Sequence, residues 1–168
     1  GRFGLPIPYW DEWDMDVHYL LFPLLNGHLD WAALFENQSE HRIVVTRLIN
    51  LIGFLANGEL DPRVGMVAGA LMWSATVALV STAVFSVLPR RWYPVLVPFW
   101  VVAALPFDSV TLFWGGQSQM YALPFTSACV LCLAAAKQPR RYHFVAAAAA
   151  STVSLFTMGS GLIAPLIA

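Results

Sequence analysis

The sequence predicts an all-α, polytopic transmembrane helical protein with about four membrane helices and an amphipathic helical region outside the membrane. Of 168 residues, 58% are hydrophobic and 11% are charged, whereas soluble domains carry roughly 25% charged residues. The charges gather in a few clusters, and apolar stretches of bilayer-spanning length run between them. This composition argues against a disordered chain, a nucleic-acid-binding protein and a small disulfide scaffold.

The clearest predicted span is Val64–Leu88, which holds no charged residue. It exceeds the ~20 apolar residues that a helix needs to cross a bilayer. Asp61 suits the N-cap position of this helix, and Pro62 suits its first turn. Gly65 and Gly69 share one face, which favours close packing against another helix but is also ordinary in membrane helices.

Three further membrane segments are expected at about 92–107, 117–136 and 140–168. The second contains Pro124, which a membrane helix tolerates when its neighbours satisfy the freed carbonyl. The third is interrupted by Gly159–Gly161, which predicts a break or a kink for packing.

The charge distribution predicts the orientation. Arg90 and Arg91 lie in one short loop, and the Lys137–Arg141 loop holds three more basic residues, together +5. Residues 1–63 hold nine acidic residues and four arginines, a net charge of −5. Because basic loops face the cytoplasm, we predict a multi-pass protein of the cytoplasmic (inner) membrane. Its extracytoplasmic region is 1–63 and its transmembrane region is 64–168.

The chain opens at Gly1 without a methionine and stops at Ala168 inside an apolar run, so we expect a fragment of a longer membrane protein. Cys129 and Cys132 lie in the apolar run 122–136, where thiols behave as small hydrophobic groups. The pair is therefore interpreted as structural, with a redox or metal role as the weaker alternative.

The outer region has helical periodicity without spanning length. Asp30 can cap a short helix at Trp31–Glu36. Asn37 with Glu40 resembles a capping box that opens a helix over about Glu40–Ala56. Its apolar face and interrupting arginines predict an interfacial helix lying on the membrane, with a tilted span as the alternative.

Four carboxylates fall within six residues near the start of the chain, interleaved with tryptophans: Asp11, Glu12, Asp14 and Asp16. A carboxylate near a low dielectric has a raised pKa and can act as a general base. Such a cluster can also anchor a metal or a positive group. A structural alternative stands beside these roles, because acidic residues favour the first turn of a helix.

A second cluster combines Glu40, His41 and Arg42 with the nearby Arg47. The two guanidinium groups suit a phosphate, although Glu40 could serve only as a cap partner and Arg42 could extend its charge to the surface. The histidines show no zinc-type spacing, and no metal site is predicted from them.

A third cluster runs from Phe107 and Asp108 through Trp114, Gly115 and Gly116 to Gln117, Ser118 and Gln119. Paired glycines let the backbone turn sharply or approach a ligand. The aromatic ring and the two amides could line a substrate cavity, or the segment could be a polar hairpin turn.

These motifs, in this order, resemble a group of bacterial polytopic membrane proteins similar to the C-type (GT-C) membrane glycosyltransferases. The resemblance rests on Pro8–Glu12, on Asn37–Arg42 and on Leu112–Gln119, with a small-residue helix break at Thr157–Leu162. In the second element the asparagine is displaced from the glutamate. In the third, Gly116 stands where an aromatic residue is usual.

The resemblance implies transfer of a sugar from a polyprenyl-phosphate donor to an acceptor on the outer face of the membrane. It makes Asp11 the candidate base with Glu12 in support, and leaves Asp14 or Asp16 as alternatives. Donor phosphate would meet Arg42 or Arg47. The expected partners are a lipid-linked sugar donor and membrane lipids, without nucleic acid, and a divalent metal stays open as a cofactor.

Two other classes of protein stay open. A transporter or channel could use the acidic cluster to gather cations, but no predicted span carries a central ionisable residue. A non-catalytic membrane assembly protein could use the amphipathic segment as a docking surface. Replacing the carboxylates would leave the activity of such a protein intact.

Overall fold

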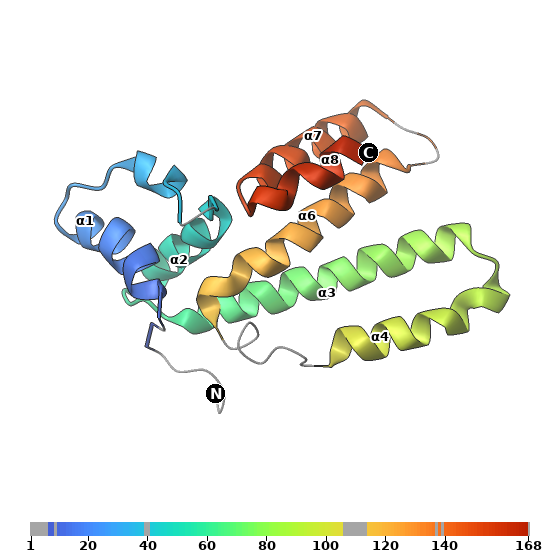
Figure 1. Ribbon diagram of the computed structural model, residues 1–168, viewed down its shortest axis with the longest axis horizontal. Coiled ribbons are helices and arrows are strands. Elements are labelled where there is room, and N and C mark those ends of the chain that lie inside the picture. The colour runs from blue at the N-terminus through green and yellow to red at the C-terminus, as the bar shows by residue number, and fades with distance from the viewer. Residues whose placement is uncertain are drawn as a thin grey trace.

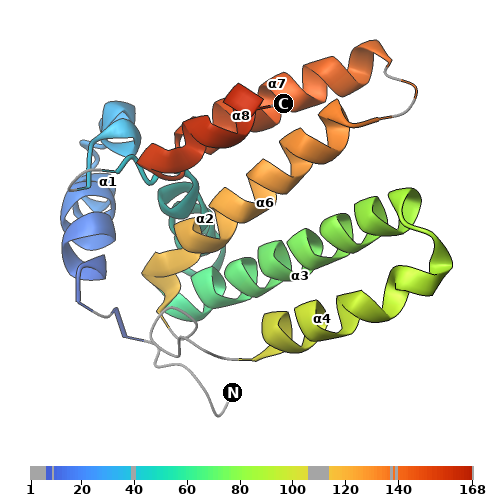
Figure 2. The same cartoon turned by 45° about the vertical axis from the view of Figure 1, so that its right-hand side comes forward.

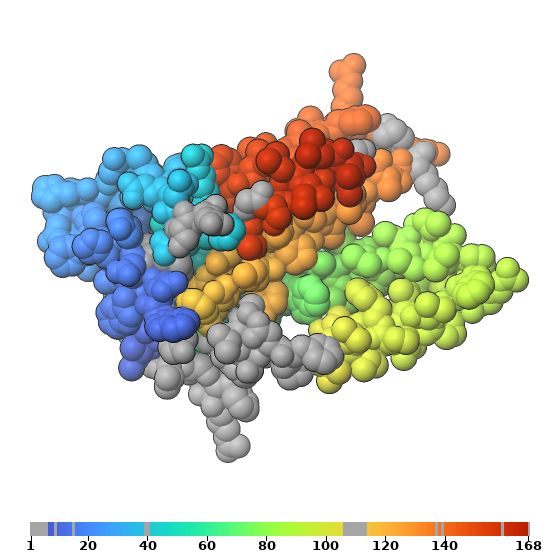
Figure 3. All heavy atoms as spheres, in the orientation of Figure 1, coloured from blue at the N-terminus to red at the C-terminus, as the bar shows by residue number. Residues whose placement is uncertain are grey.

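The computed structural model describes residues 7–8, 10–38, 41–105, 114–136, 138 and 140–167. The regular elements over these residues are all helices, and the loops between them include a single antiparallel bridge between Gln38 and His41. The N-terminal elements gather at one end, and longer helices extend from them (Figures 1 and 3). The predicted all-α class is therefore confirmed.

The N-terminal region, from residue 10 to the end of α2, folds as a small unit. A π-helical segment, Trp13–Leu21, runs into the short helix α1 (Phe22–Leu25). A 3-10 turn follows at Trp31–Phe35, and Asp30 caps it by accepting a hydrogen bond from the Ala32 N–H at 2.9 Å. The cap predicted from the sequence is therefore confirmed. Leucines from three elements form the core of this unit: Leu20, Leu21, Leu34 and Leu51.

Helix α2 (Val44–Asn57) exposes an apolar face and buries a face that mixes apolar and polar residues. Its buried face contains Thr46, Arg47 and Asn50. Its exposed face presents Ile52 and Leu55, each 64% exposed, together with Leu48. Exposed apolar side chains four and three residues apart form one stripe along the helix. We call Leu48, Ile52 and Leu55 the apolar stripe of α2.

Helix α3 (Pro62–Val87) begins as the sequence predicts. The Asp61 side chain accepts a hydrogen bond from the Arg63 N–H at 3.0 Å, and Pro62 occupies the first turn. Within the described part of the chain, α3 alone has the length and apolar composition to cross a membrane. Most of its surface is left open by the rest of the chain.

The other predicted spans are helices at the expected positions, but they are shorter. They are α4 (Leu96–Ala104), α6 (Ser118–Ala134) and α7 (Arg141–Leu155). The expectation of four full spans is not supported. Residues 90–95 before α4 form a 3-10 turn containing Pro94, which shortens that helix. The loop centred on Asp108 lies outside the described residues.

The predicted break at Gly159–Gly161 is present, and it reverses the chain instead of kinking one helix. After α7, a 3-10 turn at Gly159–Leu162 leads into α8 (Ile163–Ile167). Figures 1 and 2 show α8 returning alongside α7. The Ser154 hydroxyl donates to the Gly161 carbonyl at 2.9 Å and so closes the turn.

Helices α3 and α6 pack closely where both begin. A Cβ atom on Gly65 would lie 2.5 Å from the Gly115 carbonyl oxygen, and one on Gly69 would lie 2.7 Å from the Tyr121 ring. The close approach proposed for these two glycines is confirmed. Further along, the Cys132 thiol approaches the Leu79 carbonyl at 3.9 Å. The two helices therefore run in the same direction, side by side (Figure 2).

Replacing Gly65 by alanine is expected to lower the free energy of unfolding by about 1–3 kcal/mol, because the new methyl group overlaps backbone that cannot move alone. Gly69→Ala is the matched control on the same face. It should cost less, since the Tyr121 ring can turn aside. Thermal unfolding in detergent micelles measures both, and equal unfolding midpoints for the two variants would contradict this packing.

Candidate functional site

The acidic cluster divides into an inward and an outward pair. Glu12 is 2% exposed and Asp16 is fully buried, whereas Asp11 and Asp14 are exposed. The division follows from spacing, because side chains four residues apart lie on the same side of a helical segment. Only the outward pair is open to a substrate, and the inward pair is part of the protein interior.

Glu12 ties the acidic segment to the third cluster. Its Oε1 atom accepts a short hydrogen bond from the backbone N–H of Gly116, 104 positions away. The Trp10 and Trp114 rings also meet edge to face, with centroids 6.3 Å apart. Trp10 has φ of 50°, a conformation that bulky residues seldom adopt and that is found preferentially at functional sites. The backbone immediately before Asp11 is therefore held in an uncommon conformation.

Asp16 faces helix α2. Its Oδ2 atom accepts a hydrogen bond from the Asn50 side-chain amide at 2.7 Å. Burial raises the pKa of Asp16 to about 7, against the opposing effect of that hydrogen bond. The negative charge of Glu12 raises the pKa further, and the positive charge of Arg47 lowers it. Asp16 is therefore a group that changes charge near neutral pH.

Two oxygen atoms beside this contact have no hydrogen-bond donor among the residues that the structure describes. They are Oδ1 of Asp16 and Oδ1 of Asn50, and both are buried. A protonated Asp16 carries a donor of its own, so uptake of a proton would supply one of the donors that is missing. The arrangement favours the neutral acid.

Arg47 is buried, with 1% of its surface exposed, and its Nη1 atom donates hydrogen bonds to backbone carbonyl oxygens. It donates to the carbonyl oxygens of Ala33 at 2.9 Å, Leu34 at 3.4 Å and Glu36 at 2.6 Å. Burial lowers the pKa of Arg47, and the negative charge of Asp16 counters this effect. Arg47 thus anchors the 3-10 turn to α2.

Thr46 joins α2 to the start of α6. Its hydroxyl donates to Oε1 of Gln119 at 3.0 Å. Since a hydroxyl has one proton, the Ser118 hydroxyl at 2.8 Å is then the donor to Thr46. Gln119 is buried by this contact, while Gln117 is half-buried and Trp114 lies beside the acidic segment. The third cluster is therefore packed against the outer region.

The second cluster is divided: Arg47 is buried, whereas Arg42 lies at the surface. Arg42 is exposed, and its Nε atom donates to Oδ1 of Asn37 at 3.1 Å. His41 is half-buried and pairs through its backbone with Gln38. Glu40 lies outside the described residues. The prediction of a helix that opens with a capping box at Asn37 and Glu40 is wrong, because α2 begins at Val44 with Ile43 as its N-cap residue. Among the described residues, no group of three His, Cys, Asp or Glu side chains is placed to hold a metal ion.

Sequence reasoning did not single out Thr46 as a partner of the third cluster or Asn50 as a partner of Asp16. A signal was present, because Thr46, Arg47 and Asn50 recur at helical spacing inside an otherwise apolar helix. Polar residues on one face of an apolar helix indicate a buried polar contact as readily as a solvated face.

No known protein family, curated protein or solved structure matches this chain.

Proposed function

We propose that the chain is part of a membrane glycosyltransferase of the GT-C type, which transfers a sugar from a polyprenyl-phosphate donor to an acceptor at the outer face of the membrane. One observation carries the proposal. Two elements on which the sequence resemblance rests, the acidic segment and the segment 114–119, are in contact through Glu12 and Gly116 and through Trp10 and Trp114. Segments that build one site must meet in space.

In this proposal Asp11 is the base. It is exposed, next to the strained Trp10 and the anchored Glu12. The acceptor oxygen forms a bond to the anomeric carbon of the donor sugar, the bond from that carbon to the phosphate oxygen breaks, and the acceptor proton passes to the Asp11 carboxylate. Glu12 acts as a positioning residue, and exposed Asp14 is the alternative base.

The departing polyprenyl phosphate needs a positive partner. Arg42 fits this role better than Arg47, because its guanidinium is exposed and the single hydrogen bond described for it leaves other donors for a phosphate. The Nη1 atom of Arg47 already donates hydrogen bonds to three backbone carbonyl oxygens in the protein interior.

The membrane placement is supported by two surfaces. The apolar stripe of α2 presents hydrocarbon side chains on the outside of the outer region, as an interfacial helix does. Exposed Arg90, Arg91, Arg140 and Arg141 follow the ends of α3 and α6, at the opposite ends of these helices from the acidic segment. In the proposal, α3 crosses the membrane, the shorter helices complete a multi-pass protein, and the basic end is cytoplasmic.

The decisive experiment compares Asp11→Asn with Asp14→Asn in the membrane-embedded protein, given a polyprenyl-phosphate sugar. Asp11→Asn is expected to reduce transfer by about 100-fold or more and to leave donor binding unchanged, since a general base contributes about that factor. Asp14→Asn should retain transfer, and Arg42→Ala should weaken donor binding.

Each outcome bears on a separate part of the proposal. Unchanged transfer by Asp11→Asn would remove Asp11 as the base, and loss in Asp14→Asn instead would move the role there. Absence of donor binding by the wild-type protein would overturn the glycosyltransferase proposal and favour transport or assembly. Loss of transfer after chelation of divalent ions would add a metal to the site.

A further inference from the structure

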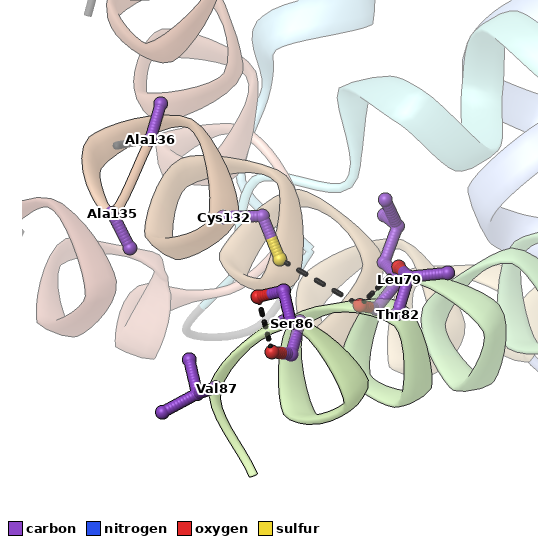
Figure 4. Close-up of a pocket in the computed structure, with 8 residues that line it drawn as sticks. Leu79, Thr82, Ser86, Val87, Cys132, Ala135 and Ala136 are labelled. Atoms are coloured by element: carbon purple, nitrogen blue, oxygen red, sulfur yellow. Dashed lines mark hydrogen bonds between the residues drawn. The ribbon is translucent and has the colours of Figure 1, made fainter. Parts of the chain in front are cut away.

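A pocket of about 410 Å³ opens between the second half of α3 and the end of α6, far from the acidic segment. Figure 4 shows side chains of both helices around it. Its volume falls within the roughly 300–1,000 Å³ of pockets that bind small molecules. The lining of the pocket includes Leu79, Thr82, Ser86, Val87, Cys132 and Ala136.

The polar atoms of the lining are turned toward the helix backbone. The Thr82 hydroxyl donates to the Leu79 carbonyl at 2.8 Å, and the Ser86 hydroxyl donates to the Ala83 carbonyl at 2.7 Å. The Cys132 thiol points to the Leu79 carbonyl as well (Figure 4). With their donors engaged, these groups present mainly carbon and sulfur to the pocket. A hydrocarbon chain suits such a lining, whereas a polar solute would lose hydrogen bonds to water on entering it.

Arginines follow both walls of this pocket. Arg90 and Arg91 come three and four residues after Val87, and Arg140 and Arg141 come four and five residues after Ala136. All four are exposed. After Asp61 the sequence has a single acidic residue, Asp108, so these charges are largely uncompensated within this half of the chain. An apolar pocket whose two walls are each followed within a few residues by positive charges matches a molecule with a hydrocarbon chain and an anionic headgroup.

We propose that this pocket binds an acyl chain of an anionic phospholipid, with the lipid phosphate held by Arg90 and Arg91. Guanidinium groups bind phosphate oxygens through paired hydrogen bonds, and an acyl chain lying between α3 and α6 gains dispersion contacts with the side chains that line the pocket. The inference requires α3 to lie in a membrane, as in the proposed function, but it does not require transferase activity. The lipid is a bound component of the helix packing and is distinct from a sugar donor.

The test is native mass spectrometry of the protein released from detergent, with phosphatidylglycerol or phosphatidylcholine of identical acyl chains added. Phosphatidylglycerol is expected to be retained preferentially. Arg90→Gln/Arg91→Gln should lower its retention by roughly 25-fold, since each basic residue near an anionic lipid contributes about fivefold. Arg63→Gln removes one positive charge at the other end of α3 and should leave retention unchanged.

A second variant tests the pocket itself. Ala83→Phe fills it and is expected to reduce retention of both lipids, whereas the arginine variant affects phosphatidylglycerol alone. Equal retention of the two lipids by the wild-type protein would overturn the proposal. So would phosphatidylglycerol binding that survives both variants, or a lipid-free dimer, which would make a second copy of the chain the occupant. Asp11→Asn is not expected to alter lipid retention, so failure of the transferase proposal is distinguishable.

Discussion

Replacing Arg47 by leucine is expected to lower the free energy of unfolding by about 3–5 kcal/mol, the usual cost of removing one partner from a buried charged contact. The variant leaves the carbonyls of Ala33, Leu34 and Glu36 without their shared donor. It also removes the positive charge that favours the ionised form of Asp16. The 3-10 turn should detach from α2, and unfolding followed by circular dichroism in micelles measures the loss.

Two controls separate this structural role from phosphate binding. Arg42→Leu removes an exposed guanidinium and should change stability by less than about 0.5 kcal/mol, as is usual for surface substitutions. Arg47→Lys keeps the charge but has a different set of donors, and should fall between wild type and leucine. A stable Arg47→Leu protein that fails to bind donor would contradict the anchoring role and return Arg47 to the phosphate site.

Stability is expected to fall as the pH rises from about 4 to about 7, because of Asp16. Its pKa is about 7 in the folded protein and near 3.8 in the unfolded chain. Between these values the folded state holds a proton that the unfolded state has released, so the free energy of unfolding decreases with pH. The decrease is about 1.4 kcal/mol per pH unit, or roughly 4 kcal/mol over the window. Above pH 7 the contribution of this group is constant.

Asp16→Asn is expected to remove this slope, because the amide is neutral throughout. Asp14→Asn is the matched control, since Asp14 is exposed and lies in the same segment. Unfolding midpoints at pH 5 and pH 8 give the comparison. Identical pH profiles for wild type and Asp16→Asn would show that Asp16 is ionised in the folded protein over the whole range.

The elements predicted correctly are those whose boundaries are set by local chemistry. Asp61 and Pro62 fix the start of α3, and Asp30 fixes the start of the 3-10 turn. Asn57 ends α2 because Gly58 adopts φ of 75°. Four full spans are not supported by the described residues. Hydropathy measures how long an apolar run is and not where the chain turns back, as it does after Leu155.

The site was predictable in composition but not in arrangement. The sequence identified the acidic cluster, yet Glu12 and Asp16 are separated from Asp11 and Asp14 by contacts with Gly116 and Asn50, which lie far away in the chain. Only tertiary packing decides which carboxylate meets solvent. Arg47 illustrates the same limit, because an arginine that holds backbone carbonyls and one that awaits a phosphate look alike in sequence.

Helix α2 exposes apolar side chains and buries polar ones, and this distribution decides which substitutions an engineer should choose. In a water-soluble protein the outside of a helix accepts charge and the inside does not. Here the buried Thr46, Arg47 and Asn50 cannot be made apolar singly without stranding a partner. The apolar stripe of α2, in contrast, makes no such polar contact. Glutamate or lysine at Leu48, Ile52 and Leu55 would therefore increase the solubility of the N-terminal region in water without breaking a buried hydrogen bond.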